Sequence, residues 1–86
     1  MMSKIANALE AKLPPMSGKK LTKNLCNRHG FKIINNYGSH YTIINTSHRD
    51  PILLQVYMHN ELKRGTLSGI LARAHISRQE FLESLK

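Results

Sequence analysis

Hydrophobic and polar residues follow two different periods along the chain, and the change of period separates helices from strands. At the start, Ile5 and Leu9 lie at helical spacing, and Pro14-Pro15 end this weakly amphipathic segment. Helical spacing returns after Ser17, with Leu21 and Leu25 one turn apart. We therefore treat residues 1–14 as an N-terminal extension and residues 15–86 as one domain.

The first helix of this domain has a recognisable beginning and end. Ser17 can cap its N-terminus, because a serine oxygen accepts hydrogen bonds from free backbone N–H groups. Gly30 can end it, because glycine readily takes the left-handed conformation of a helix C-cap.

Three segments rich in β-branched and aromatic residues follow: "FKIIN", "HYTIIN" and "ILLQVYMH". The turn sequences "NYGS" and "TSHRDP" separate them, which predicts a three-stranded antiparallel meander. The third segment alternates plainly. Its expected core side holds Ile52, Leu54, Val56 and Met58, and its other side holds Gln55, Tyr57 and His59.

Helical spacing then resumes after Gly65-Thr66, with an apolar stripe of Leu67, Ile70, Leu71 and Ala74. Ser77 and Glu80 form a capping-box pattern, which predicts a short final helix carrying Phe81, Leu82 and Leu85. The predicted order is α-β-β-β-α with extensions, an α+β fold. Its helices pack on one face of the sheet and leave the other face to solvent or a ligand.

The period of two assigns side chains to the two faces of the sheet. Phe31, Ile33, Tyr41 and Ile43 join the core. The opposite face gathers Lys32, His40, Thr42, Tyr57 and His59. A β-bulge near Gly38 would instead move His40 to the core side.

Charge narrows the choice of partners. The 86 residues carry a formal net charge of +8, with a pI of about 10.1. Such a surface attracts polyanions, and nucleic acid, anionic membrane and an acidic protein all qualify. No stretch approaches the roughly 18 to 20 apolar residues of a membrane span.

The cellular compartment is inferred from the single cysteine and the N-terminus. Cys26 excludes an internal disulfide and is expected to be a buried thiol. Polar residues, including Lys4 and Glu10, interrupt the start of the chain, unlike the apolar core of a signal peptide. We expect a cytoplasmic protein.

His40 is the strongest candidate for chemistry, because it follows the turn residues Gly38 and Ser39 on an exposed rim. An imidazole titrates near neutral pH and can take the proton of an RNA 2′-hydroxyl, whose oxygen then attacks the adjacent phosphorus. The alternative is an ordinary turn residue. The other histidines are weaker candidates: His29 and His75 stand at helix ends, His48 lies in a loop, and His59 is either structural or a phosphate contact.

Lys63 and Arg64 precede a predicted helix N-terminus, where cations and free N–H groups can hold a phosphate. An ordinary loop is the alternative. We expect no metal site and no cofactor, because the histidines lack cysteine partners at zinc-site spacing and Asp50 and Glu61 are the only nearby carboxylates.

Residues from about Leu13 to Leu85 resemble the HicA toxins of toxin–antitoxin pairs, which are messenger-RNA interferases. The resemblance lies in four segments: "LPPMSGKKLTKNLCNRHGFKI", "GSHYTI", "VYMHNELKRGTL" and "ILARAHISRQEFLESL". It implies a double-stranded-RNA-binding-like fold, an essential histidine at His40, and a HicB-type antitoxin that blocks the nuclease surface. It also implies substrate contacts or supports at His59 and at Lys63 to Thr66. Many members have a proline where this chain has Tyr57, whose ring can stack on a base.

The leading hypothesis is therefore a metal-independent endoribonuclease, the toxin of a type II toxin–antitoxin system. His40 is the catalytic residue, and Gly38, Ser39, His59, Lys63, Arg64, Lys32 and Tyr57 contact RNA. One alternative is a non-catalytic double-stranded-RNA-binding module, which reads shape and needs no imidazole. Another is a protein whose basic charge serves only an acidic protein partner.

Overall fold

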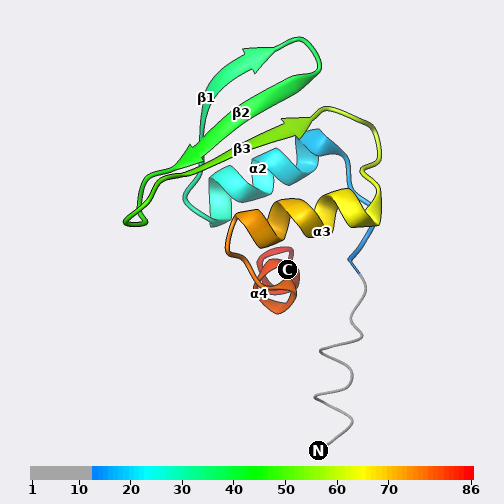
Figure 1. Cartoon of the computed structure of the whole chain (residues 1–86). Coiled ribbons are helices and arrows are strands. Elements are labelled where there is room, and N and C mark those ends of the chain that lie inside the picture. The colour runs from blue at the N-terminus through cyan, green and yellow to red at the C-terminus, as the bar shows by residue number, and fades with distance from the viewer. Residues whose placement is uncertain (1–12) are drawn as a thin grey trace, which may run out of the picture.

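A computed structural model describes residues 13–86, and the predicted helix over the first twelve residues lies outside this range. Figure 1 shows a three-stranded sheet with helices on one side. The elements are α2 (Gly18–Arg28), β1 (Lys32–Tyr37), β2 (His40–Asn45), β3 (Ile52–Tyr57), α3 (Arg64–Arg73) and α4 (Arg78–Ser84). The predicted α+β class and element order are confirmed.

The predicted boundaries of α2 are confirmed by its hydrogen bonds. The Ser17 hydroxyl accepts from the backbone N–H of Lys20 at 3.0 Å, as an N-cap does. Leu21 and Leu25 are fully buried, and Gly30 has a φ of 78°, in the left-handed region that ends many helices.

The sheet is antiparallel with the strand order β1-β2-β3, so β2 is central. Helices α2 and α3 pack chiefly against β3, whose buried and exposed residues alternate as predicted. Ile52, Leu54 and Val56 face the core, while Met58 just beyond the strand is half-buried against it. The open face of the sheet lies on the side away from the helices (Figure 1).

The prediction that Ile33 belongs to the core is wrong, because its side chain is 50% exposed. Ile33 pairs with the buried Ile43 and so lies on the core side of the sheet. All six residues of β1 are nevertheless exposed, because this edge strand lies beyond the helices that cover β3 (Figure 1). Phe31, immediately before β1, does reach the core.

The sheet contains a β-bulge, located in β1 rather than near Gly38. Ile33 pairs with Ile43 and Asn35 with Thr42, so Ile34 has no partner on β2. His40 therefore remains on the open face, as predicted. Because of this extra residue, Asn35, Asn36 and Tyr37 each lie on the face opposite to the one that a regular alternation would give them.

The C-terminal helices follow the predicted pattern. Leu67, Leu71 and Ala74 are buried, and Ile70 packs partly against the core. Helix α3 begins at Arg64, one residue before the predicted entry. The capping box of α4 is complete: the N–H of Glu80 donates to the Ser77 hydroxyl at 3.0 Å, and the N–H of Ser77 donates to the Glu80 carboxylate at 3.1 Å.

The segment before α2 also packs into the domain. Leu13 and Met16 are both buried in the core, and Met16 forms an isolated antiparallel bridge with Leu62. Within residues 13–86, none of the helices has the length and apolar character of a bilayer span.

Candidate functional site

His40 is held by a two-residue hairpin. Tyr37 pairs with His40, so Gly38 and Ser39 alone connect β1 to β2. Gly38 has a φ of 53°, which favours glycine, and Ser39 does not have a positive φ, as expected for a type II′ turn. A Cβ atom at position 38 would have no neighbour within 4 Å, so the positive φ of the backbone is the reason that glycine is favoured here.

The backbone around His40 is fixed on both sides because β2 is the central strand. His40 pairs with Tyr37 on β1 and with Tyr57 on β3. The turn is also tied to β3, since the N–H of Met58 donates to the Ser39 carbonyl at 2.6 Å. His40 itself is half-buried, which leaves part of its ring accessible on the open face.

Four rings gather at this end of the sheet, and we call Tyr37, His40, Tyr57 and His59 the aromatic row. Paired residues of an antiparallel sheet point to the same face, so Tyr37, His40 and Tyr57 are neighbours on the open face. The ring centroids of His40 and Tyr57 are 5.5 Å apart, and those of Tyr57 and His59 are 5.8 Å apart. The two histidines thus flank one tyrosine.

A hollow of about 560 Å³ lies beside the row, between the end of β3 and the start of α3. Its lining includes Tyr57, His59, Lys63 and Thr66. The volume falls in the usual range of ligand pockets. An aromatic ring, an imidazole and an ammonium group are suited to a base, a proton transfer and a phosphate oxygen respectively.

The loop that carries His59 and Lys63 is braced by backbone hydrogen bonds to the start of α2. The N–H of Gly18 donates to the His59 carbonyl at 2.9 Å, and the N–H of Leu62 donates to the Met16 carbonyl at 2.8 Å. Gly18 is buried at this junction, and a Cβ there would overlap the carbonyl oxygen of Tyr57. The position of His59 therefore depends on a glycine.

The structure brings most of the predicted site residues together and places Lys32 apart from them. Lys32 lies at the far end of β1, opposite Ile44, roughly 16 Å along the strand from Tyr37. Arg64 lines a neighbouring hollow with Pro14 and Pro15, and Lys63 borders both hollows. The residues gathered at one end of the sheet are Gly38, Ser39, His40, Tyr57, His59 and Lys63.

Sequence analysis missed two residues of this region. Tyr37 joins the row only because of the bulge at Ile34, and no periodicity in "KIINNY" reveals a bulge. The need for glycine at position 18 was also missed, because it arises from the crossing of α2 over β3 and not from a turn.

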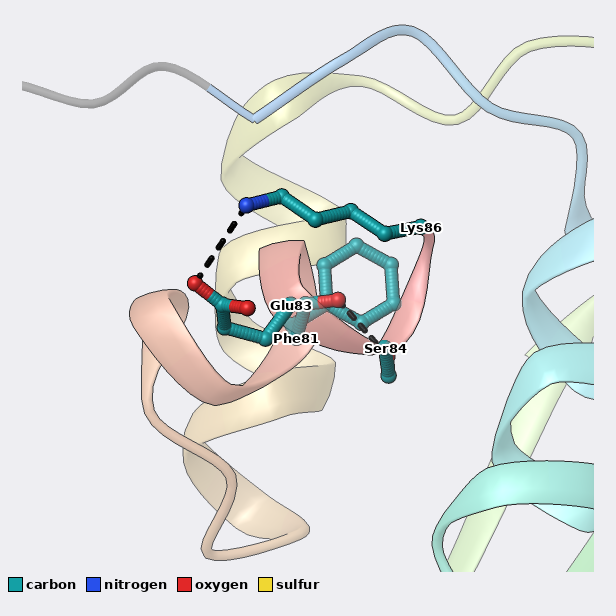
Figure 2. Close-up of polar contacts among 4 residues, drawn as sticks. All are labelled: Phe81, Glu83, Ser84 and Lys86. Atoms are coloured by element: carbon teal, nitrogen blue, oxygen red, sulfur yellow. Dashed lines mark hydrogen bonds and ion pairs between the residues drawn. The ribbon is translucent and has the colours of Figure 1, made fainter.

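A second histidine, His29, makes a contact that superficially resembles a catalytic pair. Its Nε2 lies 3.0 Å from the Ser84 hydroxyl, and the amide of Asn24 donates to the same oxygen at 3.2 Å. That hydroxyl donates its one proton to the Phe81 carbonyl at 2.6 Å (Figure 2). His29 must therefore donate to Ser84.

A serine nucleophile needs a histidine that accepts its proton, which is the reverse of this arrangement. The cluster thus joins the end of α2 to α4. Nearby, Glu83 and Lys86 form an exposed ion pair at 3.5 Å, also visible in Figure 2. Burial lowers the pKa of His29, and the charge of Glu80 opposes this with a smaller effect.

The remaining chemistry-bearing residues lie apart from the row. The rings of His48 and His75 are 6.0 Å apart, between the β2–β3 loop and the turn before α4. Cys26 is half-buried rather than buried as predicted, and desolvation raises its thiol pKa. Among residues 13–86, no three His, Cys, Asp or Glu residues form a group that could hold a metal ion.

Comparison of the chain with protein-family models, with curated proteins and with solved structures gives no match.

Proposed function

We propose that the protein is a metal-independent endoribonuclease of the HicA kind, built on a double-stranded-RNA-binding-like fold. The observation that supports this most is the position of His40, half-exposed at the centre of the aromatic row. His59 lies on the other side of Tyr57, and Lys63 shares its hollow.

His40 acts as the general base of this reaction. Its imidazole removes the proton of a 2′-hydroxyl, and the oxygen forms a bond to the adjacent phosphorus. The bond from phosphorus to the 5′-oxygen breaks, and the leaving oxygen takes a proton from the imidazolium of His59. The products are a 2′,3′-cyclic phosphate and a 5′-hydroxyl, and no external oxidant, reductant or metal is needed.

Lys63 supplies the positive charge of the site. Its ammonium group can stabilise the charge that develops on the phosphoryl oxygens. Gly38 and Ser39 form the hairpin turn beside the scissile phosphate, and the ring of Tyr57 stacks on a base. Lys32 lies too far from His40 for this role, and we assign Lys32 and Arg64 to flanking phosphates of a longer RNA.

The proposed cellular role is that of a cytoplasmic toxin acting on messenger RNA. A HicB-type antitoxin is its expected partner. A net charge of +8 makes an acidic antitoxin surface the better complement.

The test uses labelled single-stranded RNA with excess chelator, and compares the purified chain with His40→Ala and His59→Ala. Loss of a general base typically costs 10²- to 10⁴-fold in rate, so we expect His40→Ala to cleave at least about 100-fold more slowly. His48→Ala is the matched control, because His48 lies in a loop away from the row, and it should cleave like the unmodified chain.

Circular dichroism of each variant checks that it is folded. RNA binding without cleavage by any of these chains would contradict the nuclease and favour the non-catalytic RNA-binding module. Cleavage by His40→Ala at the unmodified rate would exclude His40 as the base.

A further inference from the structure

The β-bulge in β1 changes which residues face outward near His40. A regular strand would place Asn35 and Tyr37 on the same side as Ile33, toward the helices. Because Ile34 is the extra residue, Asn35 pairs with Thr42 and Tyr37 with His40, on the open face. Bulges often occur beside active sites, where they re-aim a side chain. Here the re-aimed side chain is a tyrosine, 69% exposed.

The bulge also builds a second row of neutral polar side chains. Asn35, Thr42 and Gln55 pair across the three strands, two residues along from Tyr37, His40 and Tyr57. We call these three residues the amide row. None of them is charged, and amide and hydroxyl groups both donate and accept hydrogen bonds, as base edges require. The open face thus carries a row of rings at one end of the sheet and, beside it, a row of hydrogen-bonding groups.

The spacing of the rings distinguishes between single-stranded and paired RNA. Tyr37 and Tyr57 stand two strands apart, roughly 10 Å at the usual strand separation. Stacked nucleotides of a duplex follow one another at about 3.4 Å along each strand. A tyrosine ring can also stack only on a base whose flat face is free, and duplex bases present their edges instead.

We infer that Tyr37 and Tyr57 stack unpaired bases on either side of His40, and that the amide row contacts the edges of those bases. The substrate class is therefore single-stranded RNA laid across the open face of the sheet. The inference rests on the proposed function for its RNA ligand. It adds Tyr37 and the amide row of Asn35, Thr42 and Gln55 as substrate contacts, and it excludes a duplex as the preferred ligand.

The test measures binding with an RNA that cannot be cut, so that His40 stays in place. The probe is a fluorescent 12-nucleotide 2′-O-methyl RNA, either single-stranded or annealed to its complement. The variants are Tyr37→Ala, Tyr37→Phe and Tyr57→Ala. Leu53→Ala is the matched control, because Leu53 is another large exposed hydrophobic residue, 53% exposed, at the far end of the same face.

We expect the unmodified chain to bind the single strand more tightly than the duplex. Tyr37→Ala and Tyr57→Ala should each weaken single-strand binding roughly 5- to 100-fold, the usual cost of one lost base–aromatic stack. Tyr37→Phe keeps the ring and should bind within about threefold of the unmodified chain, as should Leu53→Ala.

Equal or tighter binding of the duplex, or unchanged binding by Tyr37→Ala, would overturn the inference. Its failure is distinguishable from failure of the proposed function, because binding of this RNA does not depend on cleavage. Cleavage that requires His40, together with normal binding by Tyr37→Ala, would refute only the stacking role. Tight single-strand binding that requires Tyr37, without any cleavage of natural RNA, would refute only the nuclease.

Discussion

At the scale of single residues, Gly18 is the position where the structure leaves no room for a side chain. Its backbone N–H binds the His59 carbonyl, and its Cα lies against the backbone of Tyr57 and Met58. The neighbouring atoms belong to the backbone at the end of β3 and just beyond it, which cannot turn aside as a flexible side chain can. A methyl group here would therefore push α2 away from the strand that carries the site.

We predict that Gly18→Ala lowers the free energy of unfolding by about 2 kcal/mol or more, the usual scale of overpacking. Urea unfolding followed by circular dichroism measures this loss. Gly69→Ala is the matched control, since Gly69 lies within α3 with open space around it and alanine favours helices by roughly 0.5–1 kcal/mol. Gly18→Ala with unchanged stability would show that α2 and β3 can move apart freely.

His40 and Tyr37 illustrate how far single residues can be read from the sequence. The Gly38-Ser39 turn and the strand after it place His40 on an exposed rim, and local rules suffice for that. Tyr37 is only three residues away, yet its face depends on whether Ile34 is accommodated as a bulge. A bulge is defined by the pairing of β1 with β2, which comes later in the chain, so it is not readable from β1 alone.

At the scale of elements, caps and alternation were predictable because they involve neighbours in the sequence. Ser17 and the Ser77–Glu80 pair satisfy backbone groups within their own first turns. The exposure of Ile33 was not predictable, because it depends on how many strands two short helices can cover. Periodicity shows which side of a strand is apolar, but not whether a helix lies over it.

The junction of α2 and α4 gives the fold a dependence on pH. Burial lowers the pKa of His29 below its ordinary value of about 6.5, so the unfolded chain binds a proton more readily than the folded chain. The stabilising contribution of neutral His29 is therefore complete above about pH 6.5 and declines as the pH falls below it. Hydrogen bonds from Ser77 lower the pKa of Glu80, whose contribution declines only below about pH 4.5.

We predict that the free energy of unfolding is lower at pH 5.5 than at pH 7.5. His29→Gln removes the ionisable group at position 29, so this decrease should be smaller in the variant. Urea unfolding at three pH values, with both chains in the same buffers, measures the difference. A wild-type stability that rises on acidification in this range would contradict the sign assigned to His29.

At the scale of the whole molecule, the strands of the sheet carry little of the positive charge. Lys32 is the only charged residue in the three strands, while the other lysines and arginines of residues 13–86 lie in helices and loops. In complexes with nucleic acid, cationic side chains hold the phosphates, whereas contacts to base edges come largely from other polar groups. This division of roles is consistent with the proposed binding of single-stranded RNA.

Stability is also unevenly distributed over the molecule. Strand β3 lies under two helices, whereas β1 is exposed along its whole length (Figure 1). Segments with few buried apolar contacts open at lower free energies than the core. We predict that backbone amides of β1 exchange with solvent faster than those of β3 under native conditions.

Hydrogen exchange followed by NMR measures this directly, with β3 as the internal reference. The amides to compare are those that bond to β2, since within residues 13–86 no strand pairs with the outer edge of β1. Equal protection of β1 and β3 would indicate that the sheet opens only as a unit.

The exposed edge strand has a consequence for the proposed binding of RNA. Each local opening of β1 removes Tyr37 from the site while His40 and Tyr57 stay in place on the better-covered strands. A ligand that stacks on Tyr37 binds the closed form more tightly than the open form, and so it shifts this equilibrium toward the closed form by at most RT ln(1 + [L]/Kd). Bound RNA would then slow amide exchange in β1 more than in β3. On this proposal, the exposed edge strand of the free protein is the part that RNA binding orders most.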